Sequence, residues 1–388
     1  MAFAKSQRLQ QLPPYLFIEI DKKKRAAIAE GKDVINLGVG DPDRPTPQFI
    51  IDRMTDAIRD PANHCYPFDE GVPAFRKAAA LWMKRRFGVS IEAENELIAT
   101  IGSKDGIAHL PLAVVNPGEH VLVPQPGYPV YSSASSFAGG VVHIMDLLAK
   151  NHFLPDLDAI PKSVLGNTAL MFLNYPNNPT AAIAPLSFYE KAVALAKQYD
   201  FVIASDAAYS ELYFESPPPS ILQVDGAKDV TVEFFSLSKT FNMTGWRLGF
   251  AVGAAPVIAG LAQVKGNCDS GQFNAIQHAG VAALEGHQSL EIRNLQQMYQ
   301  QRRDTLINGF TGMGFAVSPV PATFYTWIRC QNGYGSMKMA GKILEEADVV
   351  TIPGIGFGQA GEGYIRCALT VDENRISEAI GRISKIKF

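Results

Sequence analysis

The chain has 388 residues, which is more than a single domain of roughly 150 residues contains. Its 35 basic and 38 acidic side chains give a net charge of −3, which excludes the excess positive charge that binding to nucleic-acid backbones requires. Hydrophobic residues at 47% and charged residues at 19% exclude a disordered chain. The sequence contains neither an apolar run of about 18 residues nor a secretory signal, so we expect a cytosolic protein that does not enter a membrane.

Cysteine and histidine spacing gives no sign of a metal site or of a disulfide framework. Cys65, Cys268, Cys330 and Cys367 form no CxxC pair, and none of the seven histidines belongs to an HxxxH pair. We therefore expect reduced cysteines and no bound metal.

The first predicted element is an amphipathic helix within residues 13–32, which Gly31 ends. Short apolar runs then alternate with helical patterns, for example over residues 103–114 and 185–199. This alternation predicts an α/β fold with a large, mostly parallel, seven-stranded sheet covered by helices. The seven predicted strands are residues 96–100, 120–124, 140–145, 169–174, 201–206, 230–236 and 247–253.

The remainder of the chain has a different pattern, which predicts a smaller α+β domain. A long helix is expected over residues 288–310. Strands at 322–330, 348–353 and 363–369 follow, interleaved with helices at 336–347 and 372–386. We expect an N-terminal arm and part of the small domain in residues 1–45, the large domain in 46–285, and the rest of the small domain in 286–388.

Polar residues follow several of the predicted strands of the large sheet. In an open parallel sheet, ligands bind outside the carboxyl ends of the strands, so these residues are expected to converge. They include a glycine turn that opens a helix, where backbone N–H groups would face an anion. The residues concerned are Gly102, Ser103, Lys104, Asn178, Asp206, Tyr209, Ser236, Ser238, Lys239 and Arg247.

This set of groups suits pyridoxal phosphate. That cofactor needs a lysine amine for a Schiff base, a carboxylate opposite its pyridinium nitrogen, donors to its ring oxygen and an anion cradle for its phosphate. All four are present at the predicted strand ends. The sequence therefore predicts a pyridoxal-phosphate site there.

Six motifs, in this order, resemble the fold-type-I pyridoxal-phosphate aminotransferases of class I/II. The resemblance covers nearly the whole chain and implies their fold, with a large cofactor domain and a small α+β domain. LPPYLFIEID and INLGVGDPDRPTP further resemble members that act on LL-diaminopimelate, with glutamate as donor and tetrahydrodipicolinate as acceptor. The motifs are GSKDGIAH (102–109), PGYPVY (126–131), NYPNNPT (174–180), SDAAYSEL (205–212), SLSKTFNMTGWRLGF (236–250) and GYIRCAL (363–369).

The resemblance implies a role for each residue around the cofactor ring. Lys239 would form the Schiff base and shuttle the substrate proton, and Asp206 would pair with the pyridinium nitrogen. Asn178 and Tyr209 would donate to the ring oxygen, and Tyr128 would stack on the ring.

The resemblance also implies which residues hold the phosphate. Tyr66 would reach the phosphate of the neighbouring subunit, so a homodimer is expected. The phosphate-binding residues of the same subunit would be Gly102, Ser103, Lys104, Ser236, Ser238 and Arg247.

For the substrate, Arg366 would clamp the α-carboxylate and Gly40 would approach it by its backbone. Asn178 would lie beside the substrate as well. Tyr15 and Glu70, with Asp69 as an alternative to Glu70, are expected near the distal ammonium and carboxylate of diaminopimelate.

Two positions depart from the family pattern. Ala181 follows NNPT where glycine is usual, and we expect a tighter turn without loss of a cofactor contact. Cys65 precedes Tyr66 where related chains have arginine, which leaves the preferred substrate open.

Alternative functions stay open at this point. An aminotransferase for alanine, aspartate or aromatic amino acids would keep the same cofactor, and so would a β-elimination lyase. Ser236 and Lys239 match the SxxK pattern of penicillin-interactive serine enzymes, whose SDN-like and KTG elements the chain lacks. A ligand-binding module of a transcription regulator would carry an attached winged-helix domain, whereas this chain begins with the amino-terminal helix of the enzyme.

Overall fold

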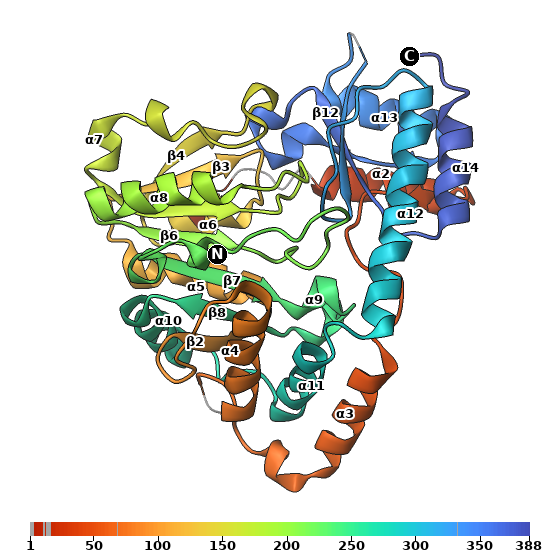
Figure 1. Ribbon diagram of the computed structural model, residues 1–388. Helices are drawn as coiled ribbons and strands as arrows, with labels where there is room; N and C mark the ends of the chain where they lie inside the picture. Colours follow the sequence, from red (N-terminus) through yellow and green to blue (C-terminus); the bar gives the residue numbers. More distant parts are fainter. Residues whose placement is uncertain (1–3, 11, 13–16, 68, 332) are drawn as a thin grey trace.

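The computed structural model describes residues 4–10, 12, 17–67, 69–331 and 333–388. Its largest element is a seven-stranded sheet of order β2-β8-β7-β6-β5-β3-β4, drawn from brown through green in Figure 1. All seven predicted strands are confirmed. They are β2 (Leu97–Thr100), β3 (His120–Gln125), β4 (Val141–Asp146), β5 (Thr168–Asn174), β6 (Val202–Asp206), β7 (Thr231–Ser236) and β8 (Gly249–Gly253).

One strand of this sheet runs against the others. β8 is antiparallel to both β2 and β7, while the remaining pairs are parallel. Between β7 and β8 the chain forms only the four-residue helix α9 (Leu237–Thr240) and a short 3₁₀ turn. A parallel crossover usually contains a helix that runs back across one face of the sheet, and residues 237–248 contain no helix long enough to do so, so the chain returns antiparallel.

Helices cover both faces of the sheet, because successive residues of each strand point to opposite sides. Leu170 and Phe172 pack in the core beneath α5, α6 and α10, whereas Met171 and Leu173 pack in the core beneath α4, α8 and α11. The six helices are α4 (Pro73–Phe87), α5 (Ser103–Val114), α6 (Val130–Phe137), α8 (Leu186–Tyr199), α10 (Ala255–Cys268) and α11 (Asn274–Glu285). The predicted helices at 103–114 and 185–199 are confirmed as α5 and α8.

A second region contains the small antiparallel sheet β11-β12-β9 and lies at the upper right of Figure 1, in blue. As predicted, a long helix precedes it and two helices are interleaved with its strands. The strands are β9 (Tyr325–Arg329), β11 (Ile352–Pro353) and β12 (Tyr364–Ala368), and the helices are α12 (Leu290–Gly312), α13 (Ser336–Ala347) and α14 (Glu373–Ile383).

The N-terminal part of the chain joins this second region. Strand β1 (Ile35–Asn36) pairs in parallel with β10 (Val349–Val350). The predicted N-terminal helix is confirmed as α2 (Phe17–Ala29), drawn in red behind α12 and α14 in Figure 1, although residues 13–16 lie outside the described residues. The expected domain boundaries at residues 45 and 285 stay predictions. The remaining helices are α1 (Gln7–Gln10), α3 (Gln48–Arg59) and α7 (Lys162–Leu165).

A buried ion pair fixes the segment that follows β1. Arg302 of α12 is 1% exposed and donates to Asp43 from both terminal nitrogens, at 2.7 and 2.8 Å. The same guanidinium donates to the Leu369 carbonyl at 3.0 Å. Such a bidentate pair has a defined geometry, so residues 38–43 are held against the long helix.

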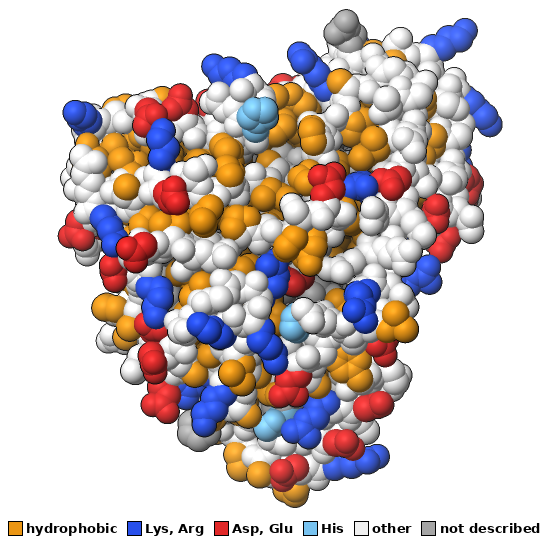
Figure 2. Space-filling view, viewed as in Figure 1, with side chains coloured by type: hydrophobic (Ala, Val, Ile, Leu, Met, Phe, Trp, Pro, Cys, Tyr) orange, Lys and Arg blue, Asp and Glu red, His pale blue; other side chains and the backbone are white. Residues whose placement is uncertain are grey.

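Acidic and basic side chains are interspersed over the face shown in Figure 2. This agrees with the near balance of 35 basic and 38 acidic residues. Among the described residues, no helix combines the length and the apolar character needed to cross a membrane.

Candidate active site

A cavity of about 890 Å³ lies at the carboxyl ends of the central strands of the large sheet. Asn174, Asp206 and Ser236 are the last residues of β5, β6 and β7, and all three line it. Arg366 of the small sheet lines it from the opposite side. The predicted site residues that line the cavity are Gly40, Ser103, Lys104, Tyr128, Asn178, Asp206, Tyr209, Ser236, Ser238, Lys239, Arg247 and Arg366.

Lys239 projects into this cavity from α9. Its Nζ donates to the Gly40 carbonyl at 3.0 Å and lies 5.5 Å from the ring centre of Phe324. Burial lowers the pKa of Lys239 from its ordinary value, against the opposing effect of Tyr325 and Asp41. A lowered pKa leaves more of the amine uncharged, which a nucleophilic lysine needs.

Asp206 places a buried carboxylate at the end of β6. Its Oδ2 accepts a hydrogen bond from the Tyr131 hydroxyl at 2.7 Å, and its Oδ1 accepts one from the Ala208 N–H at 3.2 Å. Burial raises the pKa of Asp206 from 3.8 to about 6, although both hydrogen bonds act to lower it. A cation next to this carboxylate would therefore stabilise its ionised form.

The N-terminus of α5 opens onto the same cavity. Gly102, in the left-handed region at φ 75°, precedes the helix, and no side chain caps it. Ser103 and Lys104 follow as the first helical residues and line the cavity. Backbone N–H groups at an uncapped helix start favour an anion, so this end of the cavity suits a phosphate.

Arg247 lies beside this helix start. Its Nη1 donates to the Thr244 carbonyl at 2.8 Å and to the Ser238 Oγ at 3.4 Å. The Ser238 N–H in turn donates to the Ser236 Oγ at 3.3 Å. Gly102 has φ 75°, which strains any other residue, and a Cβ there would come within 2.4 Å of Arg247 Nη2 and displace the arginine.

Arg366 holds the small-domain side of the cavity. It donates to Asn178 Oδ1 at 2.8 Å and to the Gly38 carbonyl at 2.7 Å, and its Nε is buried without a partner among the described residues. Its guanidinium also lies over the rings of Tyr325 and Phe357, at 4.0 and 4.7 Å. A buried arginine with an unused donor is suited to bind a carboxylate.

Gly40 passes directly over an aromatic side chain. A Cβ at this position would stand 1.9 Å from the Tyr325 hydroxyl oxygen, so only glycine fits. The Tyr325 hydroxyl lies 3.3 Å from that of Tyr209. The close approach brings the Gly40 carbonyl within reach of Lys239.

The turn after β5 presents Asn178. Its N–H donates to Asn174 Oδ1 at 2.9 Å, and Asn174 Nδ2 donates to the Asp206 carbonyl at 2.8 Å. Ala181 adopts φ 64° and its N–H donates to the Asn177 carbonyl at 2.9 Å. A non-glycine residue in the left-handed region costs about 1 kcal/mol, and these hydrogen bonds hold the turn in that conformation.

The site geometry agrees with a comparison against known families. The family described as aminotransferase class I and II matches residues 32–383. The chain belongs to this family. The predicted family membership, fold class and enzyme class are thereby confirmed.

Curated relatives match this aminotransferase over its whole length. LL-diaminopimelate aminotransferase of Syntrophobacter fumaroxidans is 53% identical over 389 residues, which cover 100% of both chains. The protein of the same name from Aquifex aeolicus is 50% identical over 387 residues, again with 100% of both chains covered.

Solved structures give the same result. Apo-BacF from Bacillus subtilis superposes with a TM-score of 0.95 at 36% identity, covering 99% of this chain and 98% of that chain. Aspartate aminotransferase from Thermus thermophilus, solved with maleate, superposes with a TM-score of 0.92 at 29% identity, covering 99% and 100%.

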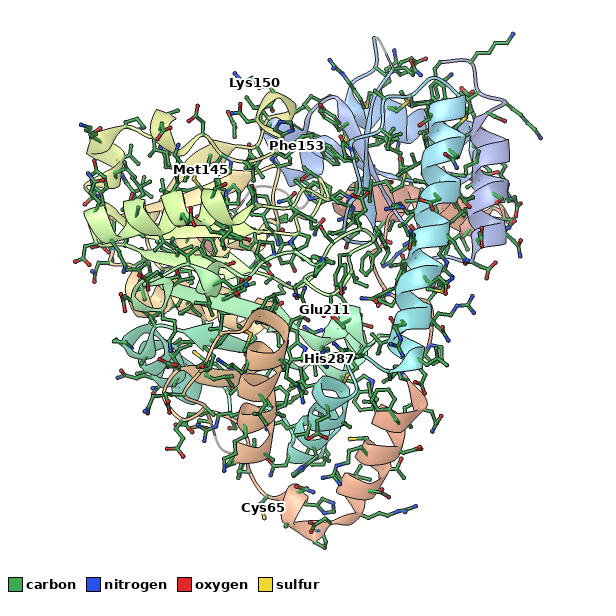
Figure 3. All side chains as sticks on the ribbon, in the orientation of Figure 1. Cys65, Met145, Lys150, Phe153, Glu211 and His287 are labelled. Atoms are coloured by element: carbon green, nitrogen blue, oxygen red, sulfur yellow. The ribbon has the colours of Figure 1, made fainter. Side chains whose placement is uncertain are left out.

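Four predicted site residues of this aminotransferase are not among those that line the cavity: Gly102, which directly precedes the lining residue Ser103, and Tyr66, Glu70 and Tyr15. Tyr66 is 89% exposed, and Glu70, four residues further along the chain, is also exposed. Tyr15 lies outside the described residues. Cys65 is exposed at the end of the molecule where α3 lies, as Figure 3 shows. The roles of Tyr66, Glu70 and Tyr15 stay predictions.

The sequence analysis missed several residues of the cavity. Tyr131 bonds Asp206, and Tyr325 lies beneath Gly40. Tyr131 belongs to the PGYPVY motif and lies three residues after Tyr128, so its helical spacing was the available signal. Tyr325 belongs to an apolar predicted strand, where an aromatic residue indicates only core packing.

Among the described residues, one cluster of potential metal ligands lies between α5 and the end of α10. Asp105, His109 and Asp269 bring ligand atoms within 4.8 Å of one another. Lys265, which is 1% exposed, donates to Asp105 at 2.5 Å and to Asp269 at 2.8 Å. The ammonium group supplies the cation that these carboxylates need, and it joins α10 to α5.

Proposed function

We propose that the protein transfers an amino group between LL-diaminopimelate and 2-oxoglutarate, with pyridoxal phosphate as cofactor. The class I and II aminotransferases depend on this cofactor in general. The substrate proposal is supported by relatives named for LL-diaminopimelate that are 50–53% identical over the full chain. The observation that carries the proposal is one cavity that holds the Lys239 amine, the Asp206 carboxylate and an uncapped helix start.

The residues of the cavity fit the cofactor at both ends. Asp206 is a carboxylate whose pKa is raised by burial, and a protonated pyridine nitrogen beside it would stabilise the ionised form. At the other end, the α5 start and Arg247 would hold the phosphate, together with Ser236 and Ser238. Bound pyridoxal phosphate supplies an aldehyde that condenses with amines and a ring that accepts the electron pair of the substrate Cα.

The residues of this chain then bind the substrate and move its proton. Arg366 would bind the α-carboxylate through Nε and a terminal nitrogen, and Asn178 would give up or share its present hydrogen bond. Lys239 would take the proton from the substrate Cα, since burial lowers the pKa of its amine. The Gly40 carbonyl, 3.0 Å from Lys239 Nζ, would orient the amine for that transfer.

A homodimer completes the proposal. Tyr66 is 89% exposed and is not among the residues that line the cavity of its own chain, and such exposure is unusual for a large aromatic side chain. We propose that Tyr66 reaches the phosphate of a second subunit, and that Glu70 reaches the mouth of the same cavity. Tyr209 and Tyr128 would contact the cofactor ring from within the subunit.

The first test is spectroscopic. Purified protein loaded with pyridoxal phosphate should show a visible absorption band that is absent from Lys239→Ala and present in a control, Lys197→Ala, at an exposed surface lysine. Single-turnover mixing with glutamate, LL-diaminopimelate, aspartate and alanine should then change the band fastest with the first two donors. A band that survives Lys239→Ala would refute the assigned lysine, and preference for alanine or aspartate would refute the substrate.

A further inference from the structure

Tyr209 and Tyr325 bring two hydroxyl groups together in the active-site cavity. Both residues line the cavity, and their hydroxyl oxygens lie 3.3 Å apart. Tyr209 is 6% exposed and Tyr325 is 4% exposed, so little water competes for this contact. Each hydroxyl carries one hydrogen and can also accept a hydrogen bond. The pair therefore forms one hydrogen bond between its members and keeps a second hydrogen for another group.

The backbone joins the segments that carry the two tyrosines. Tyr209 lies in the turn after β6, and its carbonyl accepts from the Leu212 N–H at 3.0 Å. The Leu212 carbonyl accepts from the Thr323 N–H at 2.6 Å, two residues before Tyr325. The end of one large-sheet strand is thus hydrogen-bonded to the start of β9, which fixes how far apart the two hydroxyls lie.

Thr323 holds Tyr325 in place with a strained backbone. Its φ is 67°, in the left-handed region that a β-branched residue rarely adopts. Thr323 is fully buried, and its Oγ1 accepts from the Tyr325 N–H at 3.0 Å. Backbone strain of this kind persists only where surrounding contacts enforce it, and it is concentrated at functional sites. The strain therefore points to a role for Tyr325 beyond core packing.

The other ionisable groups around Tyr209 have different hydrogen-bond partners. Asp206 accepts from Tyr131 at 2.7 Å, and Arg366 donates to an amide oxygen and to a backbone carbonyl. Among the described residues, Tyr325 is therefore the hydrogen-bond partner of the Tyr209 hydroxyl. The charged and titratable groups that face Tyr209 are Asp206 of β6, Tyr131 of α6, Tyr325 of β9 and Arg366 of β12.

We propose that Tyr325 is a positioning residue for the cofactor and acts through Tyr209. The Tyr325 hydroxyl donates to the Tyr209 oxygen, which leaves the Tyr209 hydrogen for the ring oxygen of pyridoxal phosphate. A hydroxyl that accepts one hydrogen bond donates the next more strongly, because linked hydrogen bonds polarise one another. This inference rests on the proposed function and adds a residue to its cofactor site.

The test measures the pH at which the visible band of the loaded enzyme is half converted. The band changes when the nitrogen joined to Lys239 loses its proton, and a strong donor to the ring oxygen favours that loss. Tyr325→Phe keeps the ring and should raise this pH midpoint by about 0.5 unit. In a Tyr209→Phe background, Tyr325→Phe should cause no further shift. Incorporation of 3-fluorotyrosine in place of Tyr325 makes the hydroxyl a stronger donor and should lower the midpoint.

Tyr299→Phe is the matched control. Tyr299 is also fully buried, and its ring lies 5.6 Å from that of Phe324, the neighbour of Tyr325. Its hydroxyl has no partner among the described residues, and it is not among the residues that line the cavity. The midpoint of this variant should equal that of wild type, and a shift as large as that of Tyr325→Phe would overturn the proposal.

Two further results would also overturn the role of Tyr325. One is an equal midpoint for wild type and Tyr325→Phe. The other is an undiminished shift in the Tyr209→Phe background, because the Tyr325 hydroxyl would then act without Tyr209. These results leave the proposed function intact, since the wild-type band is still formed. A wild-type protein that forms no visible band with pyridoxal phosphate would refute the proposed function, and the role of Tyr325 with it.

Discussion

Removing the charge of Asp206 should stabilise the protein in the absence of cofactor. Folding raises the pKa of this carboxyl from 3.8 to about 6, chiefly by burial. A shift of about two units corresponds to about 3 kcal/mol, at 1.36 kcal/mol per unit. The folded state binds this proton more tightly than the unfolded state does. Proton binding therefore contributes its full share to the free energy of unfolding below pH 3.8, and this share is lost as the pH rises through about 6.

Asp206→Asn keeps the shape of the side chain and removes the ionisation. The carboxylate accepts from the Tyr131 hydroxyl and from the Ala208 N–H, and an amide oxygen can replace only one of these acceptors. The lost hydrogen bond offsets about 1 kcal/mol of the gain. We therefore expect the apoprotein of the variant to be about 2 kcal/mol more stable than wild type above pH 7.

The assay is denaturant unfolding of both apoproteins at pH 8 and pH 5. The gain should be largest at pH 8 and shrink at pH 5, where the wild-type carboxyl is protonated in the folded state. Asp229→Asn is a suitable control, because that carboxylate is exposed and, among the residues that the structure describes, forms an ion pair with the exposed Lys197 alone. An Asp206→Asn apoprotein that is less stable than wild type at both pH values would refute the account of this carboxylate.

Two further substitutions test the surroundings of the site. Tyr131→Phe removes a hydrogen-bond donor 2.7 Å from Asp206, which should raise the pKa of that carboxyl further and weaken pyridoxal-phosphate binding about tenfold. An unchanged Kd for pyridoxal phosphate in a fluorescence titration of the apoenzyme would contradict this expected loss of affinity. Gly40→Ala places a Cβ 1.9 Å from the Tyr325 hydroxyl oxygen and should lower the free energy of unfolding by about 1–3 kcal/mol and reduce activity. Gly381→Ala is the control, because its Cβ would meet open space and should change neither stability nor activity. Equal stability of the two alanine variants in denaturant unfolding would contradict the predicted cost of the Gly40 contact.

The sequence predicted the large sheet well because each strand is a short apolar run between helical patterns. The rule that ligands bind at the carboxyl ends of parallel strands then brought distant residues together, and the cavity contains twelve of the predicted site residues. The direction of β8 was not predictable from its own residues. It follows from the short connection after β7, which holds no helix long enough for a crossover.

Other features of the site depend on contacts that no local pattern records. Tyr325 resembles an ordinary core residue of a strand, and only the fold places it under Gly40, more than 280 residues away in the chain. The charges of α2 look like the solvated face of a helix, yet Asp21 and Lys24 line the cavity. Tyr66 is exposed in the single chain, so its predicted role requires a second subunit.

The most direct test of the central claim is amino transfer by the purified, cofactor-loaded enzyme from LL-diaminopimelate to 2-oxoglutarate. We expect one glutamate to form for each LL-diaminopimelate consumed, no ammonia to be released without an oxo-acid acceptor, and no product to form with Lys239→Ala. Glutamate formation from alanine or aspartate but not from LL-diaminopimelate would contradict the proposed substrate. Release of ammonia without an acceptor would contradict amino transfer as the reaction.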